Sequence, residues 1–364
     1  MNNTKVFYSA LHQLHLDEYS TIINKLQSYY IINYLRRIHD DNDNKIACTA
    51  AYSGYIDIVQ TMLCLGANDI YCMICSAAYA GYIDIVQLLL MINVNNLNVS
   101  LLYSALNGHI DIAHLLLEYG ANDVNWAMRG AAGNGHIDII QLMLLRGADN
   151  VDETMFVATS KGHIDIVQLM LNHGAIHIER CMYDAVASGY IDIVQLMLLH
   201  GATNVNNTMP RAAYSGYIDI VQLMLLQGAD NITETMENAA ENGHIDIVQL
   251  MLNIDAEDIN GALIRAINRN HIDIVRLLLL HGANAKLAME NAITYNRIDI
   301  VRLLLSYGVD DIIETINIAV CHSHMDIARL LLDYRSDNKF SDMITAIKNG
   351  YLNVVILILT HNFL

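Results

Sequence analysis

The tetrapeptide Ile-Asp-Ile-Val, or a close variant of it, recurs along this chain at a nearly constant spacing, and this repetition constrains the fold more than any other feature. Every interval between copies is 27 residues except the one from 272 to 298, which is 26. A unit of this length cannot bury an apolar face alone, so neighbouring units must stack. About twelve repeats therefore predict one all-α solenoid over residues 45–364, in place of the two globular domains that 364 residues would suggest. The copies begin at Ile56, Ile83, Ile110, Ile137, Ile164, Ile191, Ile218, Ile245, Ile272, Ile298, Met325 and Leu352.

Each unit is predicted to contain two short helices with separate stop residues. In residues 231–257 the first helix buries Met236 and ends at Gly243, because glycine readily adopts the left-handed conformation that closes a helix. The second helix starts at the tetrapeptide, whose aspartate lies in the first turn, where negative charge is favoured. The first stop is Gly54, Gly81, Gly108, Gly135, Gly162, Gly189, Gly216, Gly243, Gly350, Asn270 or Asn296, and only Ser323 breaks this pattern. The second stop is Gly66, Gly120, Gly147, Gly174, Gly201, Gly228, Gly282 or Gly308, with Asn93 and Asp255 as substitutes.

The composition excludes several classes of protein. Hydrophobic residues make up 54% of the chain, which is too apolar for intrinsic disorder. The net charge of −18 argues against nonspecific nucleic-acid binding, which needs Lys and Arg against the phosphates. Apolar runs such as residues 85–92 fall well short of the roughly 20 residues that span a bilayer. We therefore expect a soluble, cytoplasmic and monomeric protein that binds neither nucleic acid nor membrane.

The residue types that usually carry chemistry follow the repeat instead. His109 is replaced by Tyr82 at the equivalent position of another unit, an exchange that a catalytic or metal-binding histidine would not tolerate. The six cysteines show no disulfide framework, and Cys72-x-x-Cys75 lacks the second pair that a zinc site requires. The sequence shows neither a nucleophile elbow nor a phosphate-binding loop. It therefore predicts no catalytic residue, no cofactor and no metal site, and hence no enzyme.

Two stretches of the repeat resemble a known family. Residues Ala239-Ala240-x-x-Gly243-His244, and residues 163–175 from His-Ile-Asp-Ile-Val to Gly-Ala, are similar to the ankyrin repeat. The resemblance implies an ankyrin-type helical solenoid that serves as a non-catalytic scaffold and binds a protein partner through its concave face. Such compact repeats, rich in Asn and Ile, resemble those of large DNA viruses of protists or of intracellular bacteria, which would place the protein in a host cell's cytoplasm.

The chain departs from the ankyrin pattern at the start of each unit. The family's Thr-Pro-Leu-His is missing, and the period is about six residues shorter than the usual 33. Only six residues lie between Ala229 and Met236, where the family carries a β-hairpin finger. We expect shortened or absent fingers. The only proline, Pro210, is predicted to lie in the first turn of a first helix, where its missing N–H costs little.

In the ankyrin family the two positions before the first stop face the concave groove, so residues that vary there are candidates for partner binding. Tyrosine and arginine are favoured anchors in interfaces, and the acidic chain favours a partner with a basic surface. The single tryptophan, Trp126, is predicted to lie in the shortened loop before another first helix, near Arg129. The predicted partner-binding residues are Tyr52, Tyr79, Trp126, Arg129, Tyr214, Glu241, Arg269 and Tyr295.

Residues 1–44 lie outside the regular array, and we expect them to be an N-terminal capping segment or a degenerate repeat. Other interpretations of the whole chain stay open. It could be an adaptor or substrate receptor in a host ubiquitin or signalling pathway, although no F-box-like helix is visible at either end. It could also be a structural virion component, or an enzyme whose activity resides in residues 1–44.

Overall fold

The computed structural model describes residues 30–34, 42–92, 96–254, 256, 258–308, 312–334 and 339–361. Within these ranges the regular elements are helices and there is no β-strand, in agreement with the predicted all-α solenoid. The chain divides into two compact units, residues Met1–His177 and Ile178–Leu364. Most of the predicted capping segment, residues 1–44, lies outside the described residues. None of the described helices combines the length and the apolar character that a membrane span requires.

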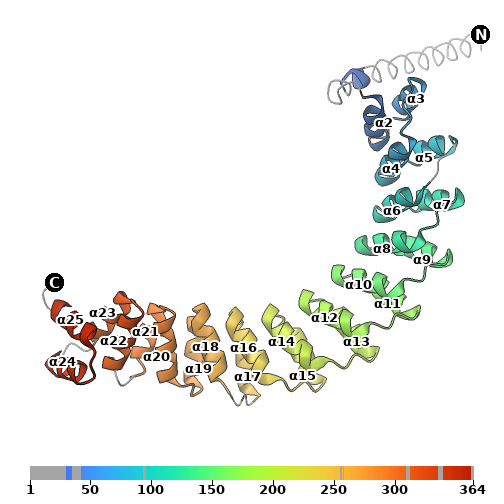
Figure 1. The fold of residues 1–364 in the computed structure, drawn as a ribbon. Coiled ribbons are helices and arrows are strands. Elements are labelled where there is room, and N and C mark those ends of the chain that lie inside the picture. The colour runs from blue at the N-terminus through green and yellow to red at the C-terminus, as the bar shows by residue number, and fades with distance from the viewer. Residues whose placement is uncertain are drawn as a thin grey trace, which may run out of the picture. The chain divides into compact units, whose positions relative to one another are not determined.

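The first unit is a row of helix pairs in which an even-numbered first helix precedes an odd-numbered second helix (Figure 1). The pairs correspond to the predicted repeats. The helices are α2 (Asp43–Tyr52), α3 (Ile56–Cys64), α4 (Ile70–Ala80), α5 (Ile83–Leu90), α6 (Asn98–Leu106), α7 (Ile110–Glu118), α8 (Val124–Asn134), α9 (Ile137–Leu145), α10 (Val151–Lys161) and α11 (Ile164–Asn172).

The second unit continues the same alternation. Its helices are α12 (Ile178–Ser188), α13 (Ile191–Leu199), α14 (Val205–Ser215), α15 (Ile218–Leu226), α16 (Ile232–Asn242), α17 (Ile245–Asn253), α18 (Asn260–Arg269), α19 (Ile272–Leu280), α20 (Ala285–Thr294), α21 (Ile298–Leu305), α22 (Ile312–Cys321), α23 (Met325–Tyr334), α24 (Lys339–Lys348) and α25 (Leu352–His361).

The core of each unit lies between its two layers of helices. First helices pack against the first helices of neighbouring repeats, as in α2 with α4, and each first helix also packs against its own second helix. The paired alanines of the first helices, such as Ala77 and Ala78, are completely buried, because small side chains let adjacent helices approach closely. From the second helices, Ile220, Val221 and Met224 are buried in the same way. Adjacent repeats therefore bury each other's apolar faces, as the short period predicts.

The predicted stop residues are confirmed. Each first-helix stop in the described residues has a positive φ, from 56° at Asn296 to 88° at Gly81, and even Ser323 adopts it at 64°. The eight glycines of the second stop also have positive φ, from 73° at Gly308 to 106° at Gly66. The two predicted substitutes at the second stop, Asn93 and Asp255, lie outside the described residues.

Side-chain oxygens hold the short loops where the ankyrin pattern would place fingers. Asn125 at the start of α8 accepts the backbone N–H groups of Asp149 and Asn150 through one oxygen, at 2.9 and 3.1 Å. The carboxylate of Asp152 does the same for Ile176 and His177. These loop N–H groups would need another hydrogen-bond acceptor if the side chains were absent. The residue that accepts them, here called the clamp residue, therefore supplies acceptors that the backbone of a β-hairpin would otherwise provide. The same position clamps the next loop through Asn44, Asn98, Glu179, Asn206 and Asn260.

The prediction for Pro210 is wrong. Pro210 is the sixth residue of α14, inside the helix rather than in its first turn, because the helix already begins at Val205. Proline offers no N–H to the carbonyl four residues earlier, that of Asn206. The amide Nδ2 of Asn231, in the next loop, lies 3.5 Å from this carbonyl oxygen and takes the place of the missing donor.

Candidate functional site

The repeats differ from one another mainly on their first helices. The second helices α13 and α15 have the same sequence, IDIVQLMLL, whereas the first helices α12 and α14 share few residues beyond the buried positions. Exposed residues that vary between otherwise similar repeats are not required for the stacking of the repeats, so they can determine the specificity for a ligand. The exposed face of the first helices is therefore where a functional site is to be sought.

A pocket of about 690 Å³ opens on this face in the first unit, over α2, α4 and α6. Four of its lining residues are tyrosines, one is an aspartate, and none of those that the structure describes there is a lysine or an arginine. Two of the predicted residues, Tyr52 and Tyr79, belong to it. The lining is Tyr52, Asp69, Tyr71, Cys72, Cys75, Ser76, Tyr79, Val99 and Tyr103.

The tyrosines form a continuous aromatic group across three repeats. The rings of Tyr52 and Tyr79 stack with their centroids 5.9 Å apart, and Tyr103 meets Tyr79 edge-on at 5.8 Å. Such ring pairs are favourable beyond the area that they bury. Tyr52, Tyr71 and Tyr79 nevertheless remain well exposed. The sequence did not single out Tyr71 or Tyr103, although Tyr71 replaces the clamp residue at its position and so breaks the repeat there.

A histidine of the following repeat fixes the backbone beside Tyr79. The Nε2 of His109 lies 3.1 Å from the carbonyl oxygen of Tyr79, and because a carbonyl only accepts, Nε2 must carry the proton. His136, His244 and His271 make the corresponding bond to the repeat before each of them. These histidines serve the structure in the manner that their exchange with tyrosine predicts.

The floor of the pocket is uncharged. Burial raises the pKa of the Cys75 thiol, although hydrogen bonds with Ser100 and Tyr71 work in the opposite direction. The pKa of Tyr71 is raised as well, first by burial and then by Cys75. Cys75 is thus a neutral, buried thiol whose sulfur lies 3.3 Å from the hydroxyl of Ser100. Asp69 is the acidic residue among those that line the pocket.

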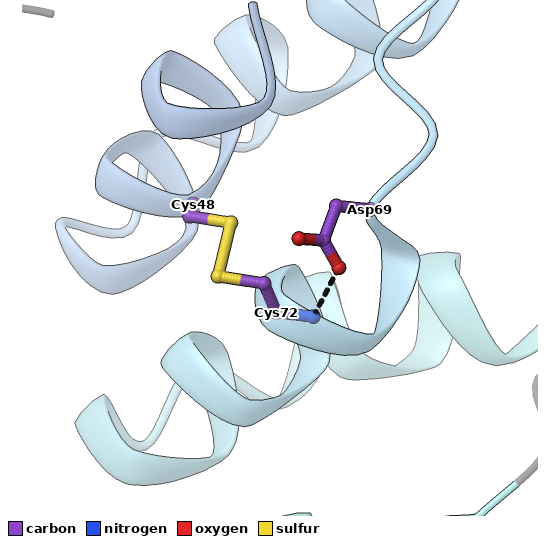
Figure 2. Close-up of side chains that lie close together, drawn as sticks. All are labelled: Cys48, Asp69 and Cys72. Carbon is purple, nitrogen blue, oxygen red and sulfur yellow. Dashed lines mark hydrogen bonds between the residues drawn. A yellow bond between two sulfur atoms is a disulfide. The ribbon is translucent and has the colours of Figure 1, made fainter.

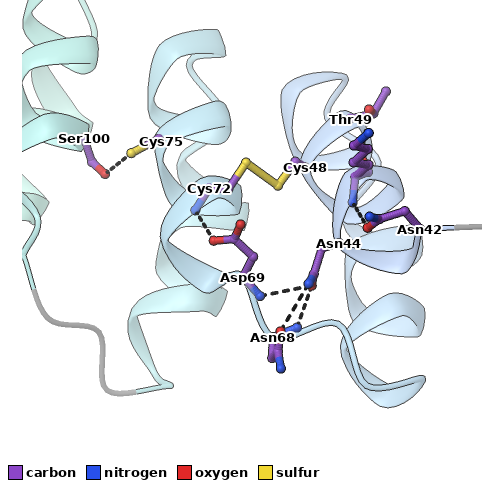
Figure 3. The surroundings of a disulfide bond; sticks show 10 residues. Asn42, Asn44, Cys48, Thr49, Asn68, Asp69, Cys72, Cys75 and Ser100 are labelled. Atoms are coloured by element: carbon purple, nitrogen blue, oxygen red, sulfur yellow. Dashed lines mark hydrogen bonds between the residues drawn. A yellow bond between two sulfur atoms is a disulfide. The ribbon is translucent and has the colours of Figure 1, made fainter. Parts of the chain in front are cut away.

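A disulfide lies beside the pocket and corrects the prediction for the cysteines. Cys48 of α2 is bonded to Cys72 of α4, with their Cα atoms 5.9 Å apart (Figure 3). The two are separated by 24 residues, one helical turn less than the repeat of 27. Other contacts between neighbouring first helices share this offset, among them the ion pair of Arg129 with Glu153. A search at the repeat period therefore misses the pair, whereas a search at 24 finds it.

The remaining predicted residues do not join the pocket. Trp126 is exposed and lies in the first turn of α8, not in the loop before it as predicted, because the helix already begins at Val124. Arg129, one turn later, is paired with Glu153 at 3.2 Å. Tyr214 of the second unit lies under the guanidinium of Arg211, with the Cζ atom 5.4 Å from the ring centre. Tyr295 is exposed just after the end of α20.

Glu241 and Arg269 belong to a charged network on α16 and α18. Arg265 lies between two carboxylates, 3.0 Å from Glu237 and 2.7 Å from Glu241, and Arg269 pairs with the other oxygen of Glu241 at 3.1 Å. Hydrogen bonds from Arg265 and Arg269 hold the pKa of Glu241 below its usual range. The two predicted residues therefore bind each other in the free protein.

This network makes stability depend on pH in a defined direction. Because the pKa of Glu241 is lowered on folding, its contribution is present above the ordinary carboxylate range and is lost as the pH falls through the lowered pKa. We expect Glu241→Gln to lose about 1 kcal/mol of unfolding free energy at pH 7. The loss should shrink towards zero below about pH 4. Chemical denaturation across this range measures it.

Glu234→Gln is the matched control for that prediction. Glu234 lies on the same helix, and its carboxylate accepts from the uncharged amide of Asn231 at 2.8 Å. Its substitution should change stability little and with a flatter pH profile. A difference for Glu241→Gln that persists unchanged at pH 3 would contradict the assignment of its stabilisation to the charged pairs.

The stacked helix pairs and their variable first-helix face define a helical-repeat solenoid protein. The family model for ankyrin repeats, in groups of three copies, matches residues 47–125, 128–209, 209–289 and 236–316, which is most of the chain. The chain therefore belongs to the ankyrin-repeat family, whose repeats are generally protein–protein interaction modules. A search of curated proteins finds no match.

Proposed function

We propose that this protein is a non-catalytic scaffold that binds a protein partner through the exposed face of its first helices. The principal anchor is the pocket over α2, α4 and α6, here called the tyrosine pocket. The observation that carries the proposal is the gathering of Tyr52, Tyr71, Tyr79 and Tyr103 around one pocket, in a chain whose second helices are nearly uniform. Partly exposed tyrosines provide large contact areas with few rotatable bonds, which is why interfaces use them as anchors.

The chemistry of the pocket favours a basic side chain of the partner. Lysine and arginine bind over the faces of aromatic rings, and Asp69 adds a carboxylate at the same pocket. The net charge of −18 attracts a basic surface before contact is made. The ligand that fits is therefore an exposed segment of a protein that presents Lys or Arg between apolar residues.

The other predicted residues take lesser parts in this proposal. Trp126, Tyr214 and Tyr295 are exposed and do not line the pocket. Trp126 would extend the contact within the first unit, whereas Tyr214 and Tyr295 lie on the second unit. Arg129, Glu241 and Arg269 already have ionic partners within the chain. Binding through them would require those pairs to be rearranged, so we assign them a smaller share of the affinity.

Peptide selection tests the proposal without knowledge of the natural partner. Peptides selected from a random phage-displayed library on the immobilised full-length chain should share a Lys or Arg flanked by apolar residues. Tyr79→Ala should weaken the binding of such a peptide by about tenfold or more, since truncating an interface anchor commonly costs more than 1–2 kcal/mol. Added salt should also weaken it.

Tyr214→Ala provides the matched control. Tyr214 occupies the same position in its repeat, and its exposed fraction of 47% is close to the 44% of Tyr79. The proposal expects little change from this variant. Equal losses of affinity in both variants would show that binding is spread over the first helices and is not centred on the pocket. The proposal is overturned if the selected peptides lack basic residues, or if they bind both variants as well as they bind the wild type.

A further inference from the structure

Three potential metal ligands converge at the edge of the pocket. They are the sulfurs of Cys48 and Cys72 and a carboxylate oxygen of Asp69, and all lie within 4.8 Å of one another (Figure 2). They come from α2, from the first turn of α4 and from the residue before α4. Thiolate sulfur and carboxylate oxygen are ligand types that Zn²⁺ takes in proteins.

The local structure fixes the carboxylate of Asp69. One of its oxygens accepts the backbone N–H of Cys72 at 3.1 Å, and in Figure 2 the other points towards the two sulfurs. The loop that carries Asp69 is held by Asn44, whose side-chain oxygen accepts the N–H groups of Asn68 and Asp69 at 2.8 and 3.1 Å. Such outer contacts orient a ligand before the metal arrives.

We propose that Cys48, Cys72 and Asp69 form a redox-controlled binding site for Zn²⁺. In the oxidised state the two sulfurs are bonded to each other. A dithiol reductant transfers two electrons and two protons to the disulfide, which becomes two thiols, while the dithiol is itself oxidised to a disulfide. Zn²⁺ then binds both sulfurs as thiolates, and two protons are released.

The spacing of the two helices suits this second state. The Cα atoms of Cys48 and Cys72 are 5.9 Å apart. Two sulfurs that each lie about 2.3 Å from a tetrahedral zinc ion are separated by about 3.8 Å, which rotation of the side chains supplies. Asp69 and Cys72 also line the pocket, so water reaches the site and completes the coordination. Once the two protons have left, the bound ligands carry a combined charge of −3, and this favours a divalent cation.

The site differs from the one suggested by the sequence motif. Cys75 is the second cysteine of Cys72-x-x-Cys75, but its sulfur is buried against Ser100 on the far side of α4 from Cys48 (Figure 3). The partner of Cys72 is therefore Cys48 of the preceding repeat. In both redox states α2 and α4 stay connected, by a covalent bond or through the metal.

Titration of the full-length chain with Co²⁺, a spectroscopic substitute for Zn²⁺, tests the proposal. Protein reduced with dithiothreitol, and freed of it under nitrogen, should bind one Co²⁺ with a thiolate-to-metal charge-transfer band that Zn²⁺ abolishes. Oxidised protein should show no band, and neither should Cys48→Ser or Cys72→Ser. Asp69→Asn should weaken binding by at least about tenfold. The band distinguishes this site from histidines, which lack it.

Cys75→Ser and Cys64→Ser are the control variants and should keep the band. As a second measurement, Zn²⁺ should slow alkylation of Cys48 and Cys72 by iodoacetamide in the reduced wild type, with exposed Cys64 unaffected. The proposal is overturned if reduced wild type shows no band, if Cys48→Ser retains it, or if Zn²⁺ protects neither cysteine. Neither measurement involves a protein partner, so its failure would leave the proposed function standing.

Discussion

Gly216→Ala should destabilise the protein by about 3–5 kcal/mol. Gly216 ends α14 with a φ of +84°, and placing a side chain in this conformation costs roughly 1–2 kcal/mol. A Cβ atom there would also lie 2.5 Å from Cε1 of His244. The ring must then move and lose its bond to the carbonyl of Tyr214, 3.2 Å away, which adds about 1 kcal/mol to the strain of overpacking. Chemical denaturation followed by circular dichroism measures the loss.

Gly228→Ala separates the two causes. Gly228 has a nearly equal φ of +88°, but a Cβ atom there meets nothing within 4 Å. It should lose only the backbone part, about 1–2 kcal/mol. The double variant Gly216→Ala/His244→Ala should destabilise by less than the sum of its two single variants, because the clash is then gone. Equal losses at the two glycines would show that the histidine ring moves aside at no cost.

The helices and their ends could be predicted from the sequence because the information is local. A glycine or asparagine at a fixed place in each unit closes a helix wherever it lies, and the structure confirms these stops. The start of a first helix depends instead on contacts from the preceding repeat. The backbone N–H groups of Thr203 and Asn204, in the loop before α14, donate to the carboxylate of Glu179, and α14 begins directly after this loop, early enough to enclose Pro210. Counting along one repeat could not reveal this.

The candidate site was predicted only in part for a geometric reason. Tyr52 and Tyr79 occupy equal positions in successive repeats, and a comparison at the repeat period finds them. Tyr103 lies 24 residues after Tyr79, and Cys72 lies 24 residues after Cys48. Neighbouring first helices thus also bring together residues that are 24 positions apart in the sequence. Such partners do not occupy equivalent positions in their 27-residue repeats, because the spacing is about one helical turn shorter than the repeat. That offset follows from how the helices pack, and no single repeat encodes it.

Ile247→Ala should lose about 3 kcal/mol, within the range for a large-to-small change in a core. Ile247 of α17 is 1% exposed, and α17 packs against α15, α16 and α19. Ile245, two residues earlier on the same helix, is 39% exposed, and its change to alanine should lose about 1 kcal/mol. Both changes improve helix propensity, so the difference between the variants reports the greater burial of Ile247 together with the cavity that its loss leaves.

Hydrogen exchange should also show which helices are destabilised in Ile247→Ala. In a solenoid each repeat contacts only its neighbours, so the defect should stay local. Amides of α15 to α19 should lose protection in Ile247→Ala, whereas those of α4 and α5 should keep theirs. A uniform loss of amide protection along the whole chain would instead mean that all repeats unfold as one cooperative unit. Similar losses of unfolding free energy in Ile245→Ala and Ile247→Ala would place the core elsewhere than between the two layers of helices.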